Sequence, residues 1–352
     1  MNIKITGTGS YIPKEIISNE DFENHQFLNT DGSQIRHTSS VVIDKFQKIT
    51  GIEERRYAPD ELNTSDIAFL AAEKAIADAR IDPETLDYII VAHNFGDVDK
   101  NSPQADTVPS LAARVKHLLR IQNPYCVAYD VLFGCPGWIE GVIQALSFMK
   151  SGMAKKCLII GAETLSRVID PYDRDSMIYA DGSGATVLEI SEKAGGIIST
   201  ISASYTYNEA NFLYFGNTYN ADSSDTTKYI KMYGRKIYEF ALTHVPLAMK
   251  KCLDKSNTHI SEVKKILIHQ ANEKMDEAIV KRFYELYGQE APDGIMPMSI
   301  QKLGNSSVAT IPTLYDLILQ GKIEHQFIHS GDILLFASVG AGMNINAFLY
   351  QF

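Results

Sequence analysis

The sequence predicts an α/β fold built from two duplicated halves, each with helices layered on a sheet. Helical and strand patterns alternate along the 352 residues, which is typical of layered α/β proteins. The order of elements in the first half returns in the second half, as an internal duplication requires. We therefore expect halves at residues 1–190 and 191–352, a boundary near residues 191–196, and a site to which both halves contribute.

The first repeated unit is a helix, a polar turn and an apolar strand. In the first half the helix covers residues 64–79 and the strand residues 88–92. In the second half a helix near residues 233–251 leads into a strand at residues 265–269. Superposing the strands places His269 opposite an alanine, so the second half carries a polar side chain where the first carries a methyl group.

A second repeated unit places two polar groups at matching positions. A strand at residues 127–132 is followed by Cys135 and a helix, and Asn305 in the second half is also followed by a helix. Cys135 and Asn305 are therefore expected to begin equivalent helices.

Composition limits the classes of protein that the chain can belong to. The net charge is −10 and Lys and Arg form no block, so we expect no nucleic-acid partner. No apolar run reaches membrane-spanning length, which predicts no membrane partner. Four cysteines without an export signal favour reduced thiols and a cytoplasmic location.

Cys135 is a candidate nucleophile because of its local context. It follows a strand and a glycine, and Pro136 after it favours the start of a helix. The positive end of a helix dipole lowers a thiol pKa, so we predict a reactive thiolate at Cys135. An isolated cysteine is more often a small buried apolar residue, and we keep that interpretation for Cys126, Cys157 and Cys252.

His269 and Asn305 are candidate catalytic residues only because of their relation to Cys135. Alone, a histidine at the end of an apolar strand is more often a core residue, and an asparagine more often caps a helix or lies in a turn. In a duplicated fold, the three groups lie at strand ends or helix starts and can converge on the centre.

Eight short segments, taken in order, resemble one known family. They look like motifs of the β-ketoacyl-[acyl-carrier-protein] synthase III family of condensing enzymes, and the similarity covers nearly the whole chain. The resemblance implies the thiolase fold, which is a five-layer α-β-α-β-α sandwich, and a homodimer. The segments are residues 7–13, 50–56, 130–137, 181–184, 232–234, 269–272, 304–307 and 340–342.

The resemblance also implies a mechanism without a cofactor or a metal. Cys135 would take an acyl group from acyl-CoA or acyl-carrier protein, with the backbone N–H groups of Cys135 and Ala341 as the oxyanion hole. His269 and Asn305 would then stabilise the enolate formed as malonyl-carrier protein loses CO₂. The 3-oxoacyl product would serve fatty-acid synthesis or a secondary pathway of the dialkylresorcinol or polyene kind.

Several substrate contacts follow from the same resemblance. Arg174 matches an arginine of the family's coenzyme site, and Val108 stands where short-chain members carry an aromatic residue that restricts the acyl pocket. Because Val is smaller, we expect a medium, long or β-oxo acyl group. Met232, Gly234 and Asn272 complete the expected substrate-binding set.

Other positions depart from the family pattern. Lys45 and Ile49 replace a tryptophan and an arginine of the coenzyme site, which leaves the choice between a CoA donor and a carrier-protein donor open. Extra residues at 26–40 and 205–227 indicate a specialised branch.

A carrier-protein patch is expected on the helix after His269. Lys274, Lys281 and Arg282 lie where the family binds its acidic carrier, although a solvated helix face explains the same charges.

Three other functions compete with decarboxylating condensation. A non-decarboxylating acyltransferase would pass the acyl group from Cys135 to another nucleophile, and a catalytically silent subunit would shape another synthase. Such silent relatives usually lose the nucleophile, which this chain retains. A degradative thiolase is disfavoured because residues 340–342 lack its second cysteine.

Overall fold

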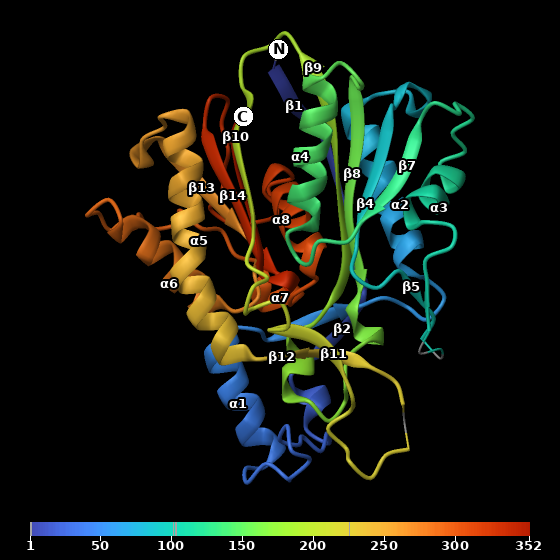
Figure 1. The fold of residues 1–352 in the computed structure, drawn as a ribbon, viewed down its shortest axis with the longest axis vertical. Helices are drawn as coiled ribbons and strands as arrows, with labels where there is room; N and C mark the ends of the chain where they lie inside the picture. The colour runs from blue at the N-terminus through green and yellow to red at the C-terminus, as the bar shows by residue number, and fades with distance from the viewer. Residues whose placement is uncertain (1, 101, 103, 225) are drawn as a thin grey trace.

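The computed structural model describes residues 2–100, 102, 104–224 and 226–352. These residues form two main sheets with helices outside and between them, which gives the five predicted α-β-α-β-α layers (Figure 1). The strands of the first sheet lie in the order β1 (Asn2–Tyr11), β9 (Asp181–Ser191), β8 (Lys156–Thr164), β4 (Tyr88–Ala92) and β7 (Val127–Val131). Those of the second lie in the order β10 (Gly196–Ser204), β15 (Asn344–Gln351), β14 (Ile333–Gly340) and β13 (Val263–Ile268).

The two sheets share one pattern of strand directions, which confirms the predicted duplication. β9 pairs antiparallel with β1 and β8, and β8 pairs parallel with β4. In the same way β15 pairs antiparallel with β10 and β14, and β14 pairs parallel with β13. The first sheet has one further strand, β7, at its edge. The chain passes from the first sheet to the second between Ser191 and Gly196.

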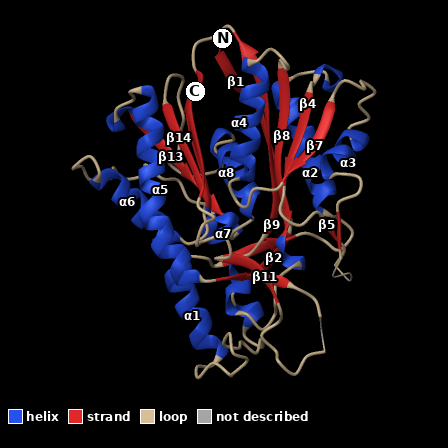
Figure 2. Ribbon diagram, viewed as in Figure 1, coloured by secondary structure: helices blue, strands red, loops and turns tan. Residues whose placement is uncertain are grey.

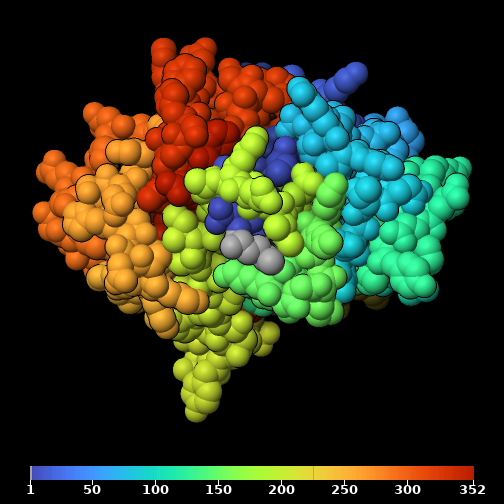
Figure 3. Space-filling view, turned by 90° about the horizontal axis from the view of Figure 1, so that it is seen from above, coloured from blue at the N-terminus to red at the C-terminus, as the bar shows by residue number. Residues whose placement is uncertain are grey.

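The layers are visible in the arrangement of the helices (Figure 2). α2 (Thr64–Ala79) and α3 (Leu111–Leu118) cover the outer face of the first sheet, and α5 (Gly234–Ser256) and α6 (Glu273–Glu285) that of the second. α4 (Gly137–Lys150) and α8 (Thr310–Leu319) fill the space between the sheets. Seen from the end that carries both termini, the cyan-to-green and orange-to-red halves lie side by side (Figure 3).

The predicted repeat units match the observed elements closely. α2 and β4 have the predicted bounds, whereas α5 begins at Gly234 and extends to Ser256. β13 ends at Ile268, so His269 lies just beyond the strand. Asn305 does not begin α8 as predicted, because the turn η6 (Ser307–Ala309) intervenes.

The central layer is packed with aromatic and aliphatic side chains that hold α4 in place. The rings of Phe336 and Phe348 stack with centroids 4.3 Å apart, and Trp138 of α4 lies 6.1 and 6.0 Å from them. Each such pair contributes about 0.5–1.5 kcal/mol beyond the burial of its area. The start of α4 therefore lies on a closely packed core, and Cys135 lies two residues before it.

A smaller layer closes the lower end of the sandwich in Figure 1. Buried Lys231 joins it to the first half, because its Nζ lies 2.6 Å from Asp170 and 3.0 Å from Asp173. No helix among the described residues is long and apolar enough to cross a membrane. The remaining elements are β2 (Glu15–Ser18), α1 (Ser39–Thr50), β3 (Glu54–Tyr57), β5 (Asp97–Val98), β6 (Ala105–Asp106), β11 (Leu213–Gly216), β12 (Tyr229–Met232) and α7 (Ile300–Leu303).

Candidate active site

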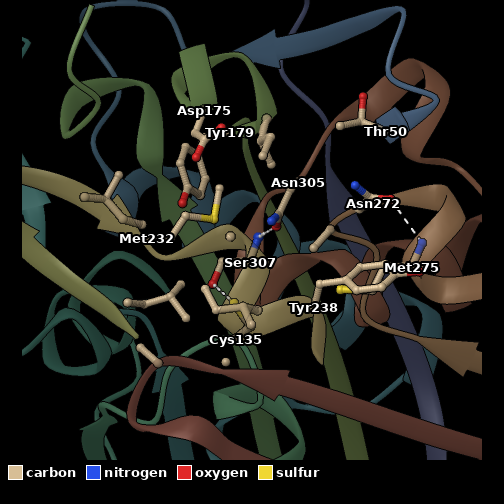
Figure 4. A pocket seen from close by; sticks show the side chains of 18 of the residues that line it. Thr50, Cys135, Asp175, Tyr179, Met232, Tyr238, Asn272, Met275, Asn305 and Ser307 are labelled. Carbon is tan, nitrogen blue, oxygen red and sulfur yellow. Dashed lines mark hydrogen bonds between the residues drawn. The ribbon is translucent and has the colours of Figure 1, made fainter. Parts of the chain in front are cut away.

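A cavity of about 660 Å³ is lined by residues of both halves (Figure 4). Cys135 precedes α4, His269 follows β13, and Asn305 precedes η6, yet all three line this cavity. The structure therefore brings the three predicted catalytic residues into one space.

Two glycines allow a close approach between the Cys135 turn and the loop after β14. A Cβ atom on Gly134 would lie 2.6 Å from the backbone nitrogen of Ala341, and one on Gly340 would lie 2.4 Å from that of Cys135. Gly134 also has a φ of +66°, which glycine adopts without strain. The two backbone nitrogens expected to form an oxyanion hole are thus brought to the same part of the cavity.

The protonation state of Cys135 differs from the prediction. Burial raises the pKa of the Cys135 thiol to about 11, although the hydroxyl of Ser307 donates a hydrogen bond to Sγ at 3.2 Å and opposes the shift. The free-energy cost of removing a thiolate from water is larger than the stabilisation that the N-terminal end of α4 gives it. The prediction of a lowered pKa at Cys135 was wrong, because burial favours the neutral thiol at neutral pH.

His269 is a buried residue of the cavity. Burial lowers the pKa of His269 to about 4, so its imidazole is neutral at pH 7. The backbone N–H of His269 donates to the carbonyl of Ala337 at 2.9 Å, while Nδ1 has no hydrogen-bond partner in the described chain. A neutral imidazole has one acceptor and one donor nitrogen, which suits both proton transfer and hydrogen bonding to a substrate oxygen.

Asn305 is held by its backbone and by its own side chain. Its N–H donates to the carbonyl of Ile178 at 3.0 Å, and its carbonyl accepts from the N–H of Ala180 at 2.9 Å. The side-chain Oδ1 accepts from the N–H of Ser307 at 2.7 Å. Because a backbone N–H needs an acceptor, this contact fixes the amide orientation and assigns Nδ2 as the donor for a substrate.

Sequence reasoning missed a polar network behind the sulfur. Asn94 Nδ2 donates to Ser307 Oγ at 3.1 Å and also to the carboxyl group of Glu163. Burial raises the pKa of Glu163 well above its ordinary value. The position of Ser307 two residues after Asn305 is the signal that points to it, whereas Asn94 and Glu163 are identified only by their tertiary contacts.

The chain is similar to known proteins along its whole length. Family models for 3-oxoacyl-[acyl-carrier-protein] synthase III match residues 129–205 and, for its C-terminal part, residues 253–352. The chain is 31% identical to β-ketoacyl-[acyl-carrier-protein] synthase III 1 of Vibrio vulnificus (strain YJ016) over 100% of both chains. It is 32% identical to the corresponding synthase III of Aquifex aeolicus (strain VF5), also over 100% of both.

The chain belongs to the 3-oxoacyl-[acyl-carrier-protein] synthase III family. The crystal structure of the Aquifex aeolicus VF5 enzyme superposes with a TM-score of 0.80 and 31% identity, covering 99% of this chain and 100% of that one. This family member is therefore an acyltransferase of the condensing-enzyme class with a thiolase-like fold.

The expected substrate-binding residues of this synthase III family member fall into two groups. Arg174, Met232, Gly234 and Asn272 line the cavity. Val108 does not, because its side chain is 85% exposed on the surface of the single chain. Val108 therefore does not border the cavity of its own chain, where it was expected to widen the acyl pocket.

The two extra segments contribute to the walls of the same cavity. Ile35 and His37 come from residues 26–40, and Leu213, together with the two residues after it, comes from residues 205–227, of which position 225 lies outside the described residues. Residues of both segments therefore line the cavity that contains Cys135.

The expected carrier-protein patch lies on α6. Lys274, Lys281 and Arg282 are exposed on this helix, whose residue Met275 lines the cavity. Arg282 also donates to the carbonyl of Leu242 on α5 at 3.3 Å, so part of its role is in helix packing. Among the described residues, no cluster of three or more His, Cys, Asp or Glu side chains could hold a metal ion.

Proposed function

We propose that this synthase III family member carries an acyl group as a thioester on Cys135 and condenses it with malonyl-carrier protein. The convergence of Cys135, His269 and Asn305 on one cavity supports this function. Ser307 strengthens the case because it contacts both the sulfur of Cys135 and the amide of Asn305.

Acyl transfer begins with loss of the Cys135 proton to the neutral imidazole of His269. The thiolate attacks the carbonyl carbon of the donor thioester, and the resulting oxyanion accepts hydrogen bonds from the backbone N–H groups of Cys135 and Ala341. The carbonyl re-forms, the bond to the donor sulfur breaks, and the leaving thiolate takes the proton back from His269.

Condensation uses the same pocket in a second step. The malonyl group of the carrier protein loses CO₂, and the electron pair of the broken C–C bond forms a thioester enolate. His269 and Asn305 Nδ2 donate hydrogen bonds to the enolate oxygen, and each such donor contributes about 3–4 kcal/mol. The enolate carbon attacks the acyl thioester, which releases Cys135 and gives the 3-oxoacyl product.

Intact mass measurement with a panel of acyl-CoA and acyl-carrier-protein thioesters tests the acyl-enzyme. An adduct that is absent from Cys135→Ala is expected, and its mass identifies the donor and the chain length. Release of CO₂ from malonyl-carrier protein tests the condensation. An adduct without CO₂ release supports a non-decarboxylating acyltransferase, and the absence of any adduct supports a silent subunit.

We also propose that the working enzyme is a homodimer. β7 is the edge strand of the first sheet, and three apolar side chains near it are exposed, namely Val108, Val127 and Leu132. An edge strand with exposed apolar neighbours needs cover. A second copy of the chain across this edge provides it, and the solution mass of the protein tests this arrangement.

A further inference from the structure

A second cavity of about 390 Å³ shares a wall with the cavity that contains Cys135. Asn94, Phe95 and Phe215 line both cavities. The rings of Phe95 and Phe215 stack with centroids 4.8 Å apart and an interplanar angle of 16°. This ring pair, with Phe95 from the loop after β4 and Phe215 from β11, forms the wall between the two cavities.

The wall lies close to the nucleophile. Asn94, next to Phe95, donates to Ser307 Oγ at 3.1 Å, and Ser307 donates to Cys135 Sγ at 3.2 Å. Two successive hydrogen bonds thus connect the sulfur of Cys135 to Asn94, a residue that lines both cavities. A hydrocarbon chain attached to Cys135 therefore starts close to the second cavity.

The lining of the second cavity suits hydrocarbon. Val98 is 2% exposed and Val168 is 6% exposed, and Leu132 and the two phenylalanine rings add further apolar surface. The two cations at its boundary make hydrogen bonds within the chain, apart from the buried Nε of Arg167, which has no partner among the described residues. Both terminal nitrogens of Arg167 donate to oxygen atoms of this chain, and Lys228 donates to Asn217. An apolar chain therefore fits this space better than an anion does.

We propose that the second cavity receives the distal part of a long fatty acyl chain carried on Cys135, after the Phe95 and Phe215 rings move apart. The inference rests on the proposed acyl-enzyme and adds its substrate class, a straight acyl chain too long for the first cavity. Each further buried methylene favours binding by roughly fourfold.

Two variants change the second cavity without touching the catalytic residues. Ala105→Trp fills it from β6, where the residue is exposed and folding is not at risk. Phe215→Ala removes half of the ring pair at a side chain that is 46% exposed. Ala194→Trp and Phe327→Ala make the same exchanges at exposed positions that line neither cavity.

Alkyl methanethiosulfonates test the proposal without any acyl transfer. They form a disulfide between Cys135 and the alkyl thiol and release methanesulfinate, so the rate of Cys135 modification by a hexyl and a tetradecyl reagent reports access alone. Intact mass gives the rates, and Cys135→Ala gives the background from the three buried cysteines.

The expected result is a change in chain-length preference. Ala105→Trp lowers the tetradecyl-to-hexyl rate ratio by about tenfold, and Phe215→Ala raises it, while both control variants keep the wild-type ratio. An unchanged ratio in both cavity variants overturns the second-cavity proposal. Failure of acyl transfer with normal alkylation ratios overturns the proposed function instead and leaves the cavity assignment standing.

Discussion

Ser307 Oγ lies 3.2 Å from Cys135 Sγ and donates a hydrogen bond to it. The N–H of the same serine holds the amide of Asn305 at 2.7 Å, so one residue orders groups that belong to different halves of the fold. Ser307 adopts a φ of +52°, a conformation that a non-glycine residue keeps only when its surroundings enforce it. The strained turn positions its hydroxyl between the nucleophile and Asn94.

Removing the Ser307 hydroxyl should slow acylation of Cys135. A hydrogen bond to a charged group contributes about 1.5–3 kcal/mol, so Ser307→Ala should lower the acylation rate by roughly 10- to 100-fold at neutral pH. Ser307→Gly, which also relieves the positive φ, should show the same loss. Burst kinetics with an acyl thioester measure the rate. Wild-type acylation in both variants would remove Ser307 from the mechanism, and Ser306→Ala is the matched control.

Asn305→Asp should separate the two half-reactions. The carboxylate keeps an oxygen for the N–H of Ser307 but loses the Nδ2 donor, so condensation should fall by about 10²–10³-fold. Acylation of Cys135 should stay measurable in this variant and in Asn305→Ala. Separate assays of adduct formation and of CO₂ release check this, and equal loss of both activities would contradict the role given to Asn305.

The sequence predicted the architecture because hydrophobic periodicity and the repeat depend on local spacing. α2 and β4 were found at their predicted bounds, and the three catalytic candidates share one cavity. The pKa of Cys135 was predicted in the wrong direction, because burial depends on the residues that the whole fold packs around the sulfur.

Contacts between residues far apart in the sequence could not be predicted either. Asn94 and Glu163 meet only through tertiary packing, and neither carries a sequence signal. The outward position of Val108 depends on how the β5 and β6 hairpin leads into α3, which its aligned position did not reveal.

The raised pKa of Cys135 should be visible in the pH dependence of alkylation. The thiol is protonated below about pH 11, so the reactive thiolate fraction should increase with pH through the range where an ordinary thiol, with a pKa of about 8.5, already levels off. Iodoacetamide rates at Cys135, measured by peptide mass, check this prediction. A plateau below about pH 8 would show that the site holds a thiolate after all.

Charge reversal on α6 should weaken carrier-protein binding without changing the chemistry. The chain has a net charge of −10, so an acidic carrier is repelled at long range and needs a local cationic surface. Lys274→Glu combined with Lys281→Glu should raise the KM for malonyl-carrier protein by about tenfold at low salt and less at high salt, because salt screens exposed charges. The kcat should change little, since neither lysine lines the cavity.

The matched control carries the same change in net charge at the other end of the sandwich. Lys150 is the last residue of α4, and Lys193 lies between β9 and β10. Lys150→Glu combined with Lys193→Glu should leave the KM near the wild-type value. If both double variants raise the KM equally, total charge governs the encounter, and α6 is not a specific docking surface. If neither double variant raises the KM, Lys274 and Lys281 belong to an ordinary solvated face of α6.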